Sequence, residues 1–167
     1  MFIDKTSMKV HELFEAVEHS VLNVMPPQSE AVRDFDCSEL KLTSLEGSPT
    51  TVLDQFDCQD NELRSFKGGP KTVGGAVVAD SNMISSLEGF PKSVGSFVSL
   101  EGNELSSLHN IHKFIPKMSG FLYLSGNPIR SHVLGLLLID GITHLVYDGG
   151  KIQKIINKHL NDDRDVF

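Results

Sequence analysis

Apolar and polar residues recur along most of the chain at a fixed interval of 21 residues. The segment FDCQDNELRSFKGGPKTV aligns with FDCSELKLTSLEGSPTTV one interval earlier and with VVADSNMISSLEGFPKSV one interval later. Self-similarity at a period of this length is the mark of a repeat protein. A further step of 21 residues gives VSLEGNELSSLHNIHKF, and two looser copies follow near the C-terminus. Six repeat units therefore start at Phe35, Phe56, Val77, Val98, Leu122 and Leu145.

The apolar spacing within each unit predicts a short strand. When the first residue of a unit is counted as position 0, positions 0, 2, 7 and 10 are apolar in most units. Side chains alternate along a strand, so positions 0 and 2 point the same way from an extended segment. The expected inward pairs are Phe35/Cys37, Phe56/Cys58, Val77/Ala79, Val98/Leu100, Leu122/Leu124 and Leu145/Tyr147. We therefore expect a coil of short parallel strands, one from each unit.

The residue at position 5 is expected to stabilise the turn that follows each strand. It is asparagine in four units, at Asn61, Asn82, Asn103 and Asn127. An inward asparagine can bond the backbone groups that a buried turn would otherwise leave unsatisfied. Segments with Gly and Pro then shape the return path, which we expect to be extended or polyproline-like in the first three units. The longer apolar return over 131–139 is expected to be helical.

The segments FDCQDNELRSF, VVADSNMISSL, VSLEGNELSSL and LYLSGNPIRSH fit the frame L-x-L-x-x-N-x-L-x-x-L, followed by a return that contains proline. This pattern resembles the short, bacterial and phage type of leucine-rich repeat. The resemblance implies an α/β solenoid with short parallel strands on a concave face. The first and last units depart from the frame, because Leu40 and Gly150 stand where asparagine is expected.

Both ends of the chain are expected to form helical caps, because an open solenoid would expose its core and its strand edges. An amphipathic helix is predicted from Ser7 to the Pro26–Pro27 pair, on an apolar stripe at helical spacing. The predicted organisation is an N-terminal helical cap over 1–31, a solenoid over 32–149, and a C-terminal capping helix and tail over 150–167. Together these parts make one domain.

The charge and the cysteines limit the class of protein. A formal net charge of −7 argues against general affinity for nucleic acid and favours a basic partner surface. Two cysteines without a CxxC pair are too few for a disulfide scaffold or a zinc site made of cysteines. No secretory signal is visible, and the apolar run HVLGLLLI is too short to cross a bilayer. We therefore expect a soluble, cytoplasmic protein that binds no membrane.

No motif predicts catalysis, a cofactor or a metal site. The glycine pairs at 68–69 and 74–75 lack the spacing of a phosphate-binding loop and recur as turns. The Asp-rich runs lack the spacing of a calcium loop. Cys37 and Cys58 share an inward position in adjacent units and are expected to be core residues. His109 and His112 are too few to ligate a metal on their own. We therefore expect a protein that is not an enzyme.

The candidate binding surface comes from positions 1, 3 and 4, which should project onto the concave face. Seven of these eighteen residues are acidic and none is basic. A small apolar element accompanies the acids. The predicted partner-binding residues are Asp36, Glu39, Asp57, Gln59, Asp60, Val78, Asp80, Glu101, Tyr123, Val146 and Asp148.

This surface predicts a protein–protein interaction module that binds a basic partner through its acidic concave face. The resemblance to phage-type repeats suggests an inhibitor of a host protein, acting in the host cytoplasm. The alternative is a structural or assembly protein that self-associates through its solenoid edges or convex face. The irregular insert at 109–120 is a second candidate contact. The sequence leaves the partner and the oligomeric state open.

Overall fold

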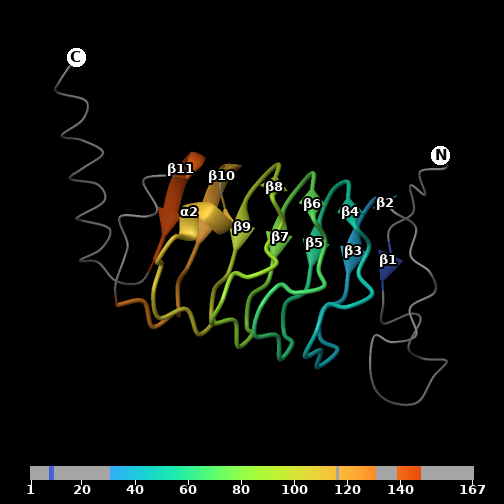
Figure 1. Ribbon diagram of the computed structural model, residues 1–167, viewed down its shortest axis with the longest axis horizontal. Coiled ribbons are helices and arrows are strands. Elements are labelled where there is room, and N and C mark those ends of the chain that lie inside the picture. Colours follow the sequence, from blue (N-terminus) through green and yellow to red (C-terminus); the bar gives the residue numbers. More distant parts are fainter. Residues whose placement is uncertain (1–7, 10–30, 116, 131–138, 148–167) are drawn as a thin grey trace.

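The chain coils into a parallel β-solenoid with a repeat of about 21 residues, seen from the side in Figure 1. The computed structural model describes residues 8–9, 31–115, 117–130 and 139–147. The turns that begin at Phe35, Phe56 and Val77 each contribute one strand to each of two parallel sheets. The predicted repeat is thus confirmed as the physical turn of the solenoid.

The larger sheet has seven strands in the order β1-β3-β5-β7-β9-β10-β11. All of its neighbouring strands are parallel, and the strands that begin four of the units pair at their first residues. The bounds are β1 Met8–Lys9, β3 Phe35–Asp36, β5 Phe56–Asp57, β7 Val77–Val78, β9 Val98–Ser99, β10 Lys117–Tyr123 and β11 Asp140–Val146.

A second parallel sheet of four strands, in the order β2-β4-β6-β8, lies on the return path. Its strands are β2 Ala31–Val32, β4 Thr51–Val52, β6 Thr72–Val73 and β8 Ser93–Val94. In each strand the valine is buried and its neighbour faces outward. The return path is therefore extended, as expected, but it is also hydrogen-bonded from turn to turn, which the prediction did not include.

The core fills the space inside the coil with the residues that the repeat frame placed there. Positions 0 and 2 are fully buried in the first five units, and position 7 is buried in the same units. Equivalent side chains stack on one another along the solenoid, as the rings of Phe35 and Phe56 do at a centroid distance of 5.7 Å. Cys37 and Cys58 are buried core residues, as predicted.

The four asparagines form a buried ladder that ties each turn to the one before it. Asn82 accepts a hydrogen bond from the Leu63 backbone N–H at 3.0 Å, 19 residues earlier. Its Nδ2 atom donates to the carbonyl oxygens of Cys58, Ala79 and Asp80, at 3.0, 3.3 and 3.1 Å. Asn61, Asn103 and Asn127 repeat this arrangement. The predicted role of position 5 is confirmed.

The insert at 109–120 lengthens one turn of the coil. It contains α2 (Ile111–Phe114), with Ile111 buried, and the first residues of β10. β10 and β11 have seven residues each, and their pairing has register shifts at Gly120. The insert is thus a helical turn leading into a longer, bulged strand, with Ile111, Ile115 and Met118 packed into the core.

The described ranges include only a few residues of the predicted helical caps. Met8–Lys9 forms strand β1, which pairs with β3, so the helix expected from Ser7 does not begin there. Strand β1 covers the otherwise open edge of β3, and this lengthens the seven-stranded sheet by one strand. Ala31, the last residue of the predicted N-terminal cap, begins β2, and the rest of both caps lies outside the described residues. So does the helix predicted over 131–139, apart from Ile139, which is buried. Among the described residues the only α-helix is α2, so the α/β character predicted from the repeat is not seen there.

Candidate functional site

The candidate site is the outward side of the seven-stranded sheet, called the outer face below. Residues directly before and after each inward position-0 residue point to this side, because side chains alternate along a strand. The column after position 0 is held in register as Asp36, Asp57, Val78, Ser99, Tyr123 and Val146. The column before position 0 is Asp34, Gln55, Ala76, Phe97, Phe121 and His144. Ala76 and Ser99 of these columns are buried there. Both columns change from polar to apolar along the solenoid.

Four carboxylates, called the acidic group, occupy the first four turns of the outer face: Asp36, Asp57, Asp80 and Glu101. The three aspartates are fixed by hydrogen bonds. Asp36 accepts from the Ser38 backbone and hydroxyl, at 3.1 and 2.7 Å. Asp80 accepts from the Ser99 hydroxyl at 2.6 Å and from the Glu101 backbone at 2.8 Å. These bonds hold the carboxylates in place without neutralising them.

The acidic group forms no ion pair with any residue of the ranges 31–115, 117–130 and 139–147. The ion pairs within the described ranges join Arg33 to Asp34 and Asp54, and Lys67 to Glu88. One basic residue does enter the sheet beside the group, since Lys9 of β1 pairs in register with Asp36. The absence of Lys and Arg noted in the sequence concerns positions 1, 3 and 4 of the six units, and β1 lies outside these units.

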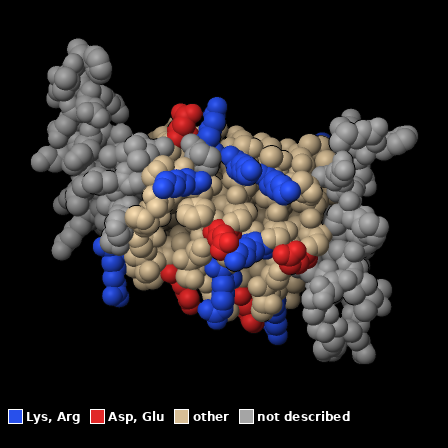
Figure 2. All heavy atoms as spheres, viewed as in Figure 1, with Lys and Arg blue, Asp and Glu red and all other residues tan. Residues whose placement is uncertain are grey.

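Basic side chains gather elsewhere on the molecule. Lys71, Lys92 and Lys113 are exposed and recur at the 21-residue interval on the return path, where the Lys92 N–H donates to the Lys71 carbonyl at 2.9 Å. Figure 2 shows several Lys and Arg side chains lying near one another on the face that it views. We call these three residues the lysine row. The solenoid thus carries charges of opposite sign at the same period on two of its surfaces.

Asp57 is a half-buried carboxylate among the other members of the acidic group. Burial raises the pKa of its carboxyl, and the neighbouring charges of Asp36 and Asp80 raise it further. Hydrogen bonds from the Gln59 backbone at 3.1 Å and the Gln55 side chain at 3.4 Å oppose this shift only in part. Ionised Asp57 therefore lowers the stability of the fold, and a cost of this kind is typical of a site shaped by binding.

Replacing Asp57 by asparagine is expected to raise Tm at pH 7 by about 1–3 °C. A raised pKa in the folded state means that stability falls as pH rises from the ordinary value of 3.8 through the folded value. The asparagine variant keeps the acceptor for Gln59 but carries no charge, so the gain should vanish at about pH 3. Thermal melts across this pH range test it, with Glu46→Gln on the return path as the control. A lower Tm for Asp57→Asn at pH 7 contradicts the expectation.

Aromatic and aliphatic side chains occupy the other end of the outer face. We call Phe97, Phe121, Tyr123, His144 and Val146 the ring patch. The Phe121 ring stacks on His144 at 4.4 Å and on Tyr123 at 5.8 Å, while Phe97 meets Tyr123 edge-on at 6.0 Å. Phe121 and Val146 are 40% and 37% exposed. Exposed stacked rings on a rigid sheet are a typical anchor for a partner.

The structure brings some of the predicted site residues together on one face and places others at the turns. Asp36, Asp57, Val78, Tyr123 and Val146 share one column of the outer face. Glu39 and Asp60 lie at the following turn, in the left-handed region with φ of 59° and 54°. Gln59 lies beside them and bonds Asp57 through its backbone. Asp148 lies outside the described residues.

Three residues of the ring patch were not predicted: Phe97, Phe121 and His144. They stand one residue before position 0, a column that the frame did not assign to the surface. The signal was available, because strand alternation places that residue on the same side as position 1. Ser99, at position 1 of the fourth unit, is buried rather than exposed.

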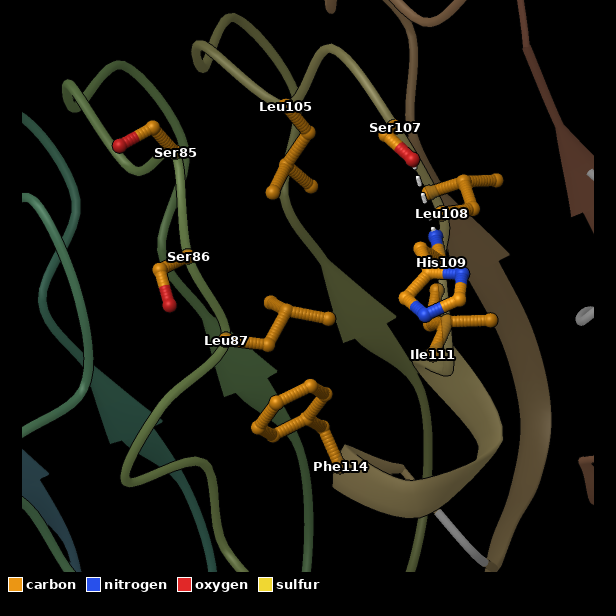
Figure 3. Close-up of a pocket in the computed structure, with 9 residues that line it drawn as sticks. All are labelled: Ser85, Ser86, Leu87, Leu105, Ser107, Leu108, His109, Ile111 and Phe114. Carbon is orange, nitrogen blue, oxygen red and sulfur yellow. Dashed lines mark hydrogen bonds between the residues drawn. The ribbon is translucent and has the colours of Figure 1, made fainter. Parts of the chain in front are cut away.

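A small cavity of about 130 Å³ opens near α2, and Figure 3 shows the side chains around it. Leu87, Leu105 and Leu108 line it together with Ile111 and Phe114. The Ser86 and Ser107 hydroxyls at its margin accept hydrogen bonds from the backbones of Glu88 and His109, at 3.2 and 3.1 Å. Equivalent serines, Ser44 and Ser65, brace the same turn in earlier units. These hydroxyls therefore stabilise the same turn in successive units of the repeat.

The two cysteines of the described part of the chain are free and lie in the core. The thiols of Cys37 and Cys58 have pKa values raised by burial, with nearby carboxylates adding to the effect. A buried thiol with a raised pKa is a poor nucleophile. No group of three His, Cys, Asp or Glu side chains suitable for a metal ion occurs among the described residues.

The geometry defines the class of protein as a parallel β-solenoid with turns of about 21 residues. Comparison of the chain with protein-family models, with curated proteins and with solved structures finds no match. No helix in the described ranges is long and apolar enough to cross a bilayer.

Proposed function

We propose that the protein is a binding module whose outer face captures a basic surface on another protein. The observation that carries the proposal is the acidic group, whose three aspartates are held by hydrogen bonds and which has no ion-pair partner among the described residues. Preorganised charges lose little freedom on binding, so more of their interaction energy contributes to affinity. Complementary charge also speeds encounter and selects the partner.

The ring patch supports the same proposal, because affinity in protein interfaces comes mainly from a few desolvated side chains. Aromatic residues are enriched among such anchors, and acids at the margin contribute more to orientation and encounter rate. Both kinds of residue occur on one face here, at opposite ends. The partner surface that fits is therefore basic at one end and apolar or planar at the other.

The outer face has the size that a specific interface needs. Strands in a sheet lie about 4.8 Å apart, so six units extend over roughly 25–30 Å. A standard interface buries on the order of 800 Å² on each partner. We further propose that the solenoid is of the leucine-rich-repeat type, supported by the asparagine ladder, and that it acts as an inhibitor by covering a basic site that its partner needs.

Reversing Asp57, Asp80 and Glu101 to lysine together is expected to weaken capture of the partner by at least about 100-fold. The measurement is a quantitative pull-down from lysate of the native host, with wild type and variant compared side by side. Proteins held by wild type and lost by the triple variant are the expected partners. Equal capture by both forms overturns the proposal.

Two control variants separate charge from folding. Reversing Glu46, Glu88 and Glu104, which are exposed outside the outer face, changes the net charge by the same amount and should leave capture intact. The neutral variant Asp57→Asn, Asp80→Asn, Glu101→Gln keeps the acceptors of the turn hydrogen bonds and should still lose capture. Matching circular dichroism spectra confirm that each variant is folded.

Self-association is the second candidate, and the lysine row is the observation that favours it. The row repeats at the same period as the acidic group, so the outer face of one copy complements the return path of another. Such a contact joins different surfaces on the two copies and does not close on itself. Light scattering distinguishes the candidates: a mass that rises with concentration at low salt supports assembly, and a constant monomer mass supports the binding module.

A further inference from the structure

We propose that the outer face selects guanidinium over ammonium groups, so that its partner presents arginine rather than lysine to the ring patch. This inference rests on the proposed function and names the chemistry of the partner. It follows from the position of exposed rings beside carboxylates that have no ion-pair partner among the described residues. The decisive region is the junction between the ring patch and the acidic group.

The two groups meet at the fourth and fifth units. Tyr123 pairs with Ser99 in the sheet, and the Ser99 hydroxyl donates to Asp80 at 2.6 Å. Glu101 lies two residues beyond Ser99, and its backbone donates to the same Asp80 oxygen at 2.8 Å. Diagonal neighbours on a sheet are on the order of 7–8 Å apart. A single arginine side chain can therefore contact the ring of Tyr123 and the carboxylate of Glu101 together.

Phe121 lies at the centre of the ring patch. His144, from the strand that leads into the sixth unit, stacks on Phe121 with ring centroids 4.4 Å apart and planes 12° from parallel. Toward the fourth unit the patch continues to Phe97, which meets Tyr123 edge-on with ring centroids 6.0 Å apart. Phe121 keeps 40% of its surface exposed. Its plane lies 14° from that of Tyr123, so the two rings form one platform.

A platform of rings next to carboxylates discriminates between the two basic side chains. Guanidinium is planar and weakly hydrated, so it can stack on a ring while its N–H groups bond a carboxylate in two places. Ammonium is compact and strongly hydrated, and it gains less from a ring face. Arginine is also the cation found more often over aromatic rings in protein structures. The platform should therefore favour arginine without needing a deep pocket.

The test compares an oligo-arginine peptide with an oligo-lysine peptide of equal length, using isothermal titration calorimetry at low salt. The expected result is that the arginine peptide binds about 5- to 20-fold more tightly. Phe121→Leu keeps an apolar side chain but removes the ring, and it should bring the two affinities within about 2-fold. Leu53→Ala, which alters an exposed apolar residue away from the outer face, should preserve the preference.

The outcomes separate this inference from the proposed function. Equal affinities for both peptides, lost on reversing the acidic group, overturn arginine selection while the acidic binding face stands. Binding that ignores both the ring substitution and the acidic reversal overturns both. No binding of the arginine peptide, or an arginine preference that survives Phe121→Leu, overturns the selection by the ring platform.

Discussion

Replacing Asn82 by alanine is expected to lower the free energy of unfolding by about 2–4 kcal/mol. Most of this loss of stability comes from one hydrogen-bond donor, the backbone N–H of Leu63. Leu63 N–H is buried and donates to the Asn82 side chain at 3.0 Å, and no other acceptor for it occurs among the described residues. The carbonyls of Cys58 and Ala79 also lose a donor, but each keeps a second one, from Asn61 and Asn103.

Thermal and urea melts followed by circular dichroism measure this effect, with an expected fall in Tm of about 5–15 °C. Hydrogen exchange at Leu63 should quicken more than at residues of distant turns. Ser85→Ala, at an exposed position three residues away, is the control and should change stability by less than about 0.5 kcal/mol. Asn82→Asp keeps the acceptor but places a buried carboxylate against carbonyl oxygens, so it should destabilise as well. An Asn82→Ala protein as stable as wild type refutes the bracing role of the ladder.

Replacing Gly95 by alanine is expected to destabilise the fold by about 2–5 kcal/mol. Gly74 and Gly95 stand at equivalent positions in the corner between the two sheets. A Cβ atom on Gly95 would overlap the Gly74 carbonyl oxygen, and one on Gly74 would overlap the Leu53 carbonyl oxygen. Because these obstacles are backbone atoms, the turns of the solenoid would have to separate to relieve them.

Gly102→Ala is the matched control for this corner. Gly102 has a φ of 63°, but the equivalent residues Asp60 and Ser81 adopt nearly the same angle with side chains. A Cβ atom there would meet its nearest neighbour at an ordinary 3.6 Å. The expected cost is about 1–2 kcal/mol, from the left-handed backbone alone. Equal destabilisation in urea melts of the two variants argues against close packing at the corner.

The inward side of the seven-stranded sheet could be predicted from the sequence because its signal is repeated. Phe56, Cys58 and Leu63 are each weak indicators, but the same spacing recurs in every unit and only one solenoid register buries them all. The asparagine ladder was predictable for a related reason. A polar side chain that recurs between buried apolar ones is itself expected to be buried, and backbone groups must then supply its hydrogen bonds.

The four-stranded sheet could not be predicted in the same way. Each of its strands has two residues and one inward valine, such as Val52 or Val73, and this is too short to show an alternating pattern. Its hydrogen bonds depend on how closely successive return paths approach. That distance is set by the glycines of the corner and by the stacking of the whole coil.

The sequence places the acidic residues of the candidate surface, together with Tyr123 and Val146, but not Phe97, Phe121 and His144. Aligned acids such as Asp36 and Asp57 follow directly from the repeat register. The ring patch depends on Phe97 and Phe121, which lie outside the repeat frame, and on a strand that the insert lengthens. Side-chain stacking across strands is a tertiary feature that no single unit encodes.

The asparagine ladder also bears on how the chain folds. Asn61 bonds Leu42 and Cys37, 19 and 24 residues earlier, so every rung closes a loop of nearly the same modest length. The entropy lost in closing each loop is therefore similar along the solenoid, and no long-range contact has to form first. Folding can nucleate at any adjacent pair of turns and propagate in both directions, as in other repeat arrays. The outer face would then assemble one strand at a time.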